Sequence, residues 1–145
     1  MKRLRRAALV LVVLLTAAQF IRPDRARATT NPGRAIQAAA GPTSPLPAVL
    51  ERACADCHSS HTVSSWYAQV APLSWVMARS VSEGRKAVNF SEWTGYPPDV
   101  QRTLLSASCD DATSGKMPGP YTWFRPEAKL SPQDVETICA AARQP

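Results

Sequence analysis

The sequence predicts a small all-α domain, and three observations support this. No stretch alternates apolar and polar residues as a half-buried strand does. Several segments instead repeat apolar residues at helical spacing. The chain has 145 residues, which is enough for one domain and too short for larger architectures such as a (βα)8 barrel. A core this small usually needs a disulfide, a metal or a cofactor for stability.

The first 28 residues have the features of an export leader. Residues 1–6 are basic, and residues 7–21 form an uncharged, mostly apolar run. A basic flank stays inside the cell while the apolar run enters the bilayer. The leader is a signal peptide or an N-terminal membrane anchor. Both alternatives predict an exported, periplasmic domain, either soluble or anchored to the cytoplasmic membrane.

The residues around the end of the leader combine features of a cleaved signal peptide and of an uncleaved anchor. The apolar run has 15 residues, fewer than the roughly 20 that span a hydrocarbon core. The small residues Ala26 and Ala28, with Arg27 between them, offer a cleavage site after Ala28. These features favour cleavage. Arg22 and Arg25 follow the apolar run at once, as in an uncleaved anchor.

The distribution of charge argues against a nucleic-acid partner. The net charge is +6, but seven of the 17 basic residues lie within residues 1–28. From Thr29 onward, ten basic residues balance ten acidic residues. The domain therefore lacks the basic surface that a polyanion requires.

The helices are expected in the following order. Residues 29–47 are rich in Pro, Ala, Gly and Thr without periodicity, which predicts a linker before a domain over residues 48–145. Within the domain, helical segments are expected over residues 47–59 and 63–70, from Pro72 to Val88, from Pro97 to Cys109, and after Ser131. Ser131 has the features of an N-cap, with Pro132 at the first helical position and Asp134 placed to complete a capping box.

Residues 54–58 form a motif typical of cofactor attachment. Cys54, Cys57 and His58 match CxxCH, the attachment motif of c-type haem. Two thiols three positions apart can form thioethers with the two vinyl groups on one edge of the porphyrin. The adjacent histidine is then placed to ligate the iron as the proximal ligand. We expect one covalent haem c, with the helices packed around it.

The two cysteines of the motif have three alternative uses. A thiol–disulfide redox pair usually occurs in a βαβ context, which is absent from the sequence. A zinc site would need two further ligands, for which His61, Cys109 and Cys139 are available. A disulfide between Cys54 and Cys57 would close a very short loop and contribute little.

The distal iron ligand has several candidates. Met117 lies in a Gly- and Pro-rich loop about 60 residues beyond His58, and such a loop can place a thioether over the opposite face of the porphyrin. Met77 is expected to pack on the apolar face of its helix. His61 is too close to His58 to reach the opposite face. Met117 is therefore favoured, and an open coordination position remains the alternative.

Cys109 and Cys139 are expected to form a disulfide. Each cysteine lies on the apolar face of a predicted helix, and the exported compartment is oxidising.

Several other side chains are candidates for contacts with the haem propionates. The candidates are Tyr67, Trp93, Tyr121 and Trp123 as hydrogen-bond donors, and Arg85, Lys86 and Arg125 as cations.

Several segments resemble the haem-binding domain family of bacterial exported c-type cytochromes. The resemblance is carried by Asn89-Phe90-Ser91-Glu92-Trp93, by residues 126–131, by Met117-Pro118, and by residues 19–23 just after the apolar run. It implies thioether bonds to Cys54 and Cys57, with His58 as the proximal and Met117 as the distal ligand. It also favours an N-terminal anchor over cleavage.

These observations predict an electron carrier rather than a substrate-converting enzyme. Iron ligated by histidine and methionine has no open position for substrate, so its use is outer-sphere one-electron transfer with a redox protein partner. A five-coordinate haem that senses a gas or peroxide, or acts as a weak peroxidase, is the alternative if Met117 does not ligate. A non-haem thiol or zinc module is the third interpretation.

Overall fold

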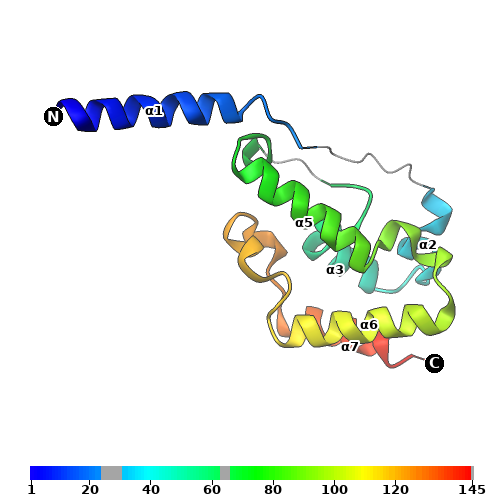
Figure 1. Ribbon diagram of the computed structural model, residues 1–145. Coiled ribbons are helices and arrows are strands. Elements are labelled where there is room, and N and C mark those ends of the chain that lie inside the picture. Colours follow the sequence, from blue (N-terminus) through cyan, green and yellow to red (C-terminus); the bar gives the residue numbers. More distant parts are fainter. Residues whose placement is uncertain (24–30, 63–65, 145) are drawn as a thin grey trace.

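The computed structural model describes residues 1–23, 31–62 and 66–144 (Figure 1). Over these residues the chain forms helices and no strand, which confirms the all-α fold class. The α-helices are α1 (Lys2–Ala18), α2 (Ile36–Ala39), α3 (Leu46–Ala53), α4 (Ala55–His58), α5 (Leu73–Ala87), α6 (Pro98–Thr113) and α7 (Pro132–Ala142). Short 3₁₀ helices lie between them: η1 (Pro32–Arg34), η2 (Trp66–Gln69), η3 (Phe90–Gly95), η4 (Gly119–Trp123) and η5 (Pro126–Ala128).

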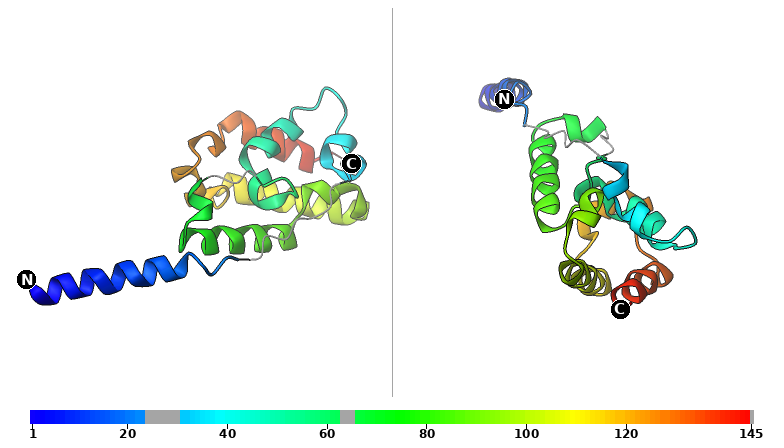
Figure 2. Two further views of the ribbon diagram at one scale, coloured as in Figure 1. Left: turned by 90° about the horizontal axis from the view of Figure 1, so that it is seen from above. Right: turned by 90° about the vertical axis from the view of Figure 1, so that its right-hand side faces the viewer.

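The helices pack in pairs around α3 and α4. Helix α4 lies against α5, and α3 lies against α7. Helices α6 and α7 run side by side at the edge of the domain farthest from α1 (Figures 1 and 2). The short helix α4, which carries most of the CxxCH motif, is therefore held between neighbours on both sides.

The helix boundaries follow local sequence signals closely. Helix α7 begins after Ser131, whose hydroxyl accepts a hydrogen bond from Asp134 N, while Asp134 Oδ2 accepts one from Ser131 N at 2.7 Å. This is the expected capping box. Arg52 of α3 forms an ion pair with the same carboxylate at 2.7 Å and thereby joins α3 to α7. Helix α6 begins at Pro98, as the proline pair predicts.

The helix expected over residues 47–59 is interrupted. Cys54 has φ −126° and ψ −29°, so the chain bends there and forms α3 and α4 instead of one helix. The bend lets Leu50 point into the core while the following turn approaches α5. Apolar spacing does not reveal this break, because the bend shifts the helix direction without changing which residues are apolar.

Part of the expected linker is packed against the domain. Ile36 is only 2% exposed and belongs to the core cluster. Arg34 forms an ion pair with Glu92 of η3 at 3.0 Å. A single apolar residue among Pro, Gly and Ala has no periodicity, so the sequence alone does not show that this segment packs.

The hydrophobic core lies among α2, α3, η3, α6 and α7. Its largest fully buried side chains are Ile36, Leu50 and Ile138. Phe90 and Trp93 of η3 add aromatic area, and their ring centroids lie 6.1 Å apart. The face of α5 that the sequence predicts as apolar is only half-buried at Met77 and Val81, while Val76 is exposed. That face is therefore not covered by the core.

Helix α1 stands apart from the rest of the molecule (Figures 1 and 2). It buries none of its residues, although it is apolar from Ala7 onward. Among residues 1–23, 31–62 and 66–144, no helix combines the length and the hydrophobicity needed to cross a membrane. The possible cleavage site at residues 26–28 lies outside the described residues.

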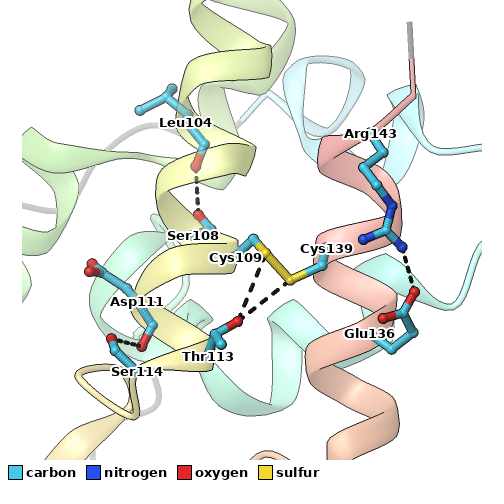
Figure 3. The surroundings of a disulfide bond; sticks show 9 residues. All are labelled: Leu104, Ser108, Cys109, Asp111, Thr113, Ser114, Glu136, Cys139 and Arg143. Carbon is cyan, nitrogen blue, oxygen red and sulfur yellow. Dashed lines mark hydrogen bonds and ion pairs between the residues drawn. A yellow bond between two sulfur atoms is a disulfide. The ribbon is translucent and has the colours of Figure 1, made fainter.

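A disulfide joins Cys109 of α6 to Cys139 of α7 (Figure 3). This is the pairing that the sequence predicts. Their Cα atoms lie 4.8 Å apart, and the bridge closes a loop with a sequence separation of 30. The Thr113 hydroxyl lies within 3.9 Å of both sulfur atoms. The bridge fixes α6 against α7.

Replacement of Cys109 and Cys139 by serine is expected to destabilise the protein. Because the bridge restricts the unfolded chain, its loss should lower the free energy of unfolding by about 3 kcal/mol. Urea unfolding of the purified protein, followed by circular dichroism, measures this difference. A change below about 1 kcal/mol would show that the bridge contributes little.

Candidate functional site

The CxxCH motif occupies the bend after α3 and the single turn of α4. Cys54 lies at the bend, and Cys57 and His58 lie in α4. Both cysteines are free thiols and are half-buried. Burial raises the pKa of Cys54 to about 12. Burial, together with the neighbouring Asp56 carboxylate, also raises the pKa of Cys57. The two thiols therefore stay protonated in this setting and are poor thiolate nucleophiles.

Helix α5 approaches α4 closely at Gly84. A Cβ atom at position 84 would lie 2.5 Å from the carbonyl oxygen of Cys57, so only glycine permits this approach. Gly84 is one of two residues of α5 that are buried. The last turns of α5 thus form the surface on which the CxxCH turn rests.

The His58 ring is oriented by the end of the same helix. Its Nδ1 lies 3.3 Å from the carbonyl oxygen of Val88, the C-cap residue of α5. A carbonyl can only accept, so Nδ1 carries the proton and donates to Val88. Burial lowers the pKa of His58 and favours the neutral ring. In the neutral ring, Nε2 keeps its lone pair for a metal ligand bond.

Asp56, between the two cysteines, connects the motif to a distant loop. Its Oδ2 accepts hydrogen bonds from the Tyr121 hydroxyl and from Arg125 Nη1, the latter at 2.7 Å. The Asp56 and Arg125 side chains are only 12% and 20% exposed. Arg125 Nε also lies 2.7 Å from Glu127 Oε1. Burial and the Asp56 carboxylate raise the pKa of Tyr121, which therefore remains a donor. This role of Asp56 is not evident from the sequence, in which the only signal is an acidic residue inside the motif.

Met117 lies in the loop between α6 and η4. Its backbone N donates to the Asp111 carbonyl of α6 at 3.1 Å, and its side chain is 42% exposed. The loop turns at Gly115 and Gly119, whose φ angles of 71° and 55° lie in the left-handed region that favours glycine. No described contact joins the Met117 side chain to His58. Met77 is half-buried on α5, and His61 is exposed.

The residues around the motif fit a haem. Tyr67 Oη is buried and, within the described residues, has no hydrogen-bond partner. The Tyr67 ring packs on Phe124, with centroids 5.4 Å apart. Buried hydroxyls normally have a partner, so a group with acceptor oxygens that lies against Tyr67 would satisfy this one. A porphyrin with its carboxylates is such a group.

Four of the other candidates for propionate contacts already have polar partners, and Trp123 is exposed. Tyr121 and Arg125 bind Asp56, and Lys86 binds Glu83 at 3.0 Å. Arg85 Nε donates to the Ser59 carbonyl at 2.7 Å. Trp93 is buried in the core between Phe90 and Tyr96. Among the buried polar atoms of these candidates in the described residues, Arg125 Nε has an ion pair with Glu127, whereas Tyr67 Oη has neither a hydrogen bond nor an ion pair.

A zinc site finds no support in the geometry. Over the part of the chain that the structure describes, no three His, Cys, Asp or Glu side chains are grouped to hold a metal ion. Cys109 and Cys139, which would complete a zinc site with the motif cysteines, are joined to each other.

Replacement of Asp56 by alanine is expected to destabilise the protein, because Tyr121 and Arg125 lose their acceptor in a poorly exposed setting. The free energy of unfolding should fall by about 2–3 kcal/mol. Glu83→Ala, which breaks the exposed pair with Lys86, is the control and should leave stability nearly unchanged. Equal effects of the two variants in urea unfolding would show that the bonds of Asp56 with Tyr121 and Arg125 do not stabilise the protein.

Replacement of Gly84 by alanine is expected to displace α4. Helix propensity alone would make this change stabilising by about 1 kcal/mol. The clash with Cys57 should instead cost about 1–3 kcal/mol and lower the haem content. Gly41→Ala is the control, because nothing lies within 4 Å of a Cβ there. Stability is measured by urea unfolding and haem content by absorbance. A Gly84→Ala protein as stable and as haem-rich as the control would contradict the predicted displacement.

Comparison with known proteins identifies the family of the chain. The model of the haem-binding domain family matches residues 13–144, which is nearly the whole chain. Comparisons with curated proteins and with solved structures gave no significant match. The resemblance seen in the sequence is thereby confirmed at the level of the family, and so is haem as the group bound. The chain belongs to the haem-binding domain family.

Proposed function

We propose that this protein is a c-type cytochrome that transfers single electrons through one covalently held haem. Cys54 and Cys57 would hold the porphyrin through thioether bonds, and His58 would ligate the iron. The observation that carries the proposal is the orientation of the His58 ring next to two free, half-buried thiols. Its Nδ1 donates to the Val88 carbonyl, so Nε2 keeps a lone pair that can ligate iron.

The residues of the chain have distinct roles in this site. Haem supplies reversible exchange between ferric and ferrous iron. The Val88 carbonyl fixes the tautomer and orientation of His58, as ligand histidines generally require. Gly84 sets the position of α4 on α5. Tyr67 Oη is proposed to donate to a haem carboxylate, since it is a buried donor with neither a hydrogen bond nor an ion pair in the described structure.

Met117 is proposed as the distal ligand. Its loop is held at one end by the Met117 N–Asp111 hydrogen bond and at the other by the contacts of Tyr121 and Arg125 with Asp56. Both ends of the loop are thus fixed relative to the CxxCH turn, which limits the conformational entropy that ligation would cost. Its half-exposed thioether has no described partner in place of iron.

Electron transfer is favoured over catalysis by the same arrangement. A thioether and an imidazole would fill both axial positions, which leaves no site for a substrate. The near-neutral charge of the domain predicts association with its redox partner that depends weakly on salt. The basic and apolar leader supports an exported location outside the cytoplasmic membrane.

Replacement of Met117 by alanine tests the function most specifically. The oxidised variant should lose the weak near-infrared band of thioether–iron ligation, and its reduction potential should fall, because thioether ligation stabilises ferrous iron. Met77→Leu is the control and should retain both properties. Absorption spectroscopy and redox titration provide the two measurements.

The outcomes separate the two haem functions. An unchanged spectrum in the Met117→Ala protein would show that Met117 is not the ligand. If the unaltered protein is also high-spin and shifts on addition of CO or cyanide, it is a five-coordinate haem protein. That result would favour gas or peroxide sensing, or weak peroxidase activity, over electron transfer.

A further inference from the structure

The segment that follows α1 is bound to the haem-binding domain by specific hydrogen bonds. The side chain of Gln19 forms two bonds with the backbone of Ala71: Oε1 accepts from Ala71 N at 2.9 Å, and Nε2 donates to Ala71 O at 3.2 Å. The indole N of Trp75, in the first turn of α5, donates to the Ile21 carbonyl at 2.8 Å. A segment that serves only for export has no need of such contacts.

Large exposed apolar side chains gather where this segment meets the domain. We call them the junction patch: Phe20, Ile21, Trp66, Val70, Trp75 and Val76. Phe20 and Trp66 are 85% and 78% exposed, which is unusual for such large side chains. Apart from Met1, α1 and this patch, the described large apolar residues that are exposed are Met117, in the loop of the expected distal ligand, and Trp123 and Phe124, at the end of η4.

The junction patch lies on the side of the domain from which α1 leaves. Figures 1 and 2 both show the end of α1 beside η2 and the N-terminal end of α5. They show α6 and α7 on the opposite side. The apolar helix and the apolar patch of the domain are therefore continuous.

We propose that residues 1–28 are retained and that the junction patch rests on the lipid surface in which α1 is embedded. The occupant is a phospholipid bilayer, because α1 is apolar from Ala7 onward, is basic at its start and buries none of its residues against protein. Tryptophans such as Trp66 and Trp75 are suited to the interface between acyl chains and water. The family match begins at residue 13, within α1 and before the possible cleavage site, so the junction segment is part of the domain that the family shares.

This inference depends on the proposed export but not on the haem ligands. The hydrogen bonds of Gln19 and Trp75 give the domain a fixed orientation, so that η2 and the start of α5 face lipid while α6 and α7 face water. A domain on a free linker would have no preferred orientation.

Site-specific photocrosslinking tests the inference on the full chain. Trp66 or Val76 is replaced by p-benzoylphenylalanine in protein made by a host that attaches haem. The matched controls place the same amino acid at Ser106 of α6 or Glu136 of α7, both exposed. Isolated membranes are irradiated, and mass spectrometry detects phospholipid adducts and reads the N-terminus of the chain.

We expect lipid adducts at positions 66 and 76, none at 106 and 136, and an intact N-terminus. Absence of adducts at 66 and 76, equal adducts at all four positions, or loss of residues 1–28 would each overturn the inference. The absorbance of the same preparations reports on haem separately. A colourless protein with the expected adducts would refute the cytochrome and leave the membrane contact standing.

Discussion

The contact between α5 and the CxxCH turn is the constraint on which the site depends. Gly84 allows the Cys57 carbonyl to approach the helix, and the Val88 carbonyl at the end of α5 orients the His58 ring. A side chain at position 84 would move α4 away, and His58 would then lose its acceptor. Helix α5 therefore determines both the position of the CxxCH turn and the orientation of the His58 ring.

The surrounding elements hold this contact in place from both sides. Arg52 joins α3 to α7 through Asp134, and the disulfide joins α7 to α6. From the end of α6 the chain returns to the motif, where Tyr121 and Arg125 bind Asp56. These links form a closed path from α4 around the domain and back. The path includes the loop of Met117, and this link to the motif supports Met117, 59 positions beyond His58, as the proposed distal ligand.

Local signals in the sequence predicted the parts that depend on local chemistry. The Ser131–Asp134 capping box, the start of α6 at its proline pair and the CxxCH motif each involve neighbouring residues. The bend at Cys54, the burial of Ile36 and the Asp56–Tyr121 bond depend on partners far away in the chain. Spacing and propensity carry no information on those partners, so only the folded structure reveals them.

Helix α5 connects the two functional regions that we propose. Its first turn carries Trp75, which binds the segment after α1, and Gly84 lies about 14 Å farther along the helix axis. A lipid contact at one end and a haem contact at the other would place the cofactor at a defined height above the membrane. Electron transfer with a membrane-bound partner would benefit from such a fixed distance.

The most direct measurement of the central claim is the intact mass of the denatured polypeptide, produced with and without haem-attachment machinery. A variant with Cys54 and Cys57 both changed to serine is the control. The account predicts that only the unaltered chain from the competent host carries the added mass of one haem, retained after denaturation. A bare polypeptide mass from that host, or haem that dissociates on denaturation, would contradict it.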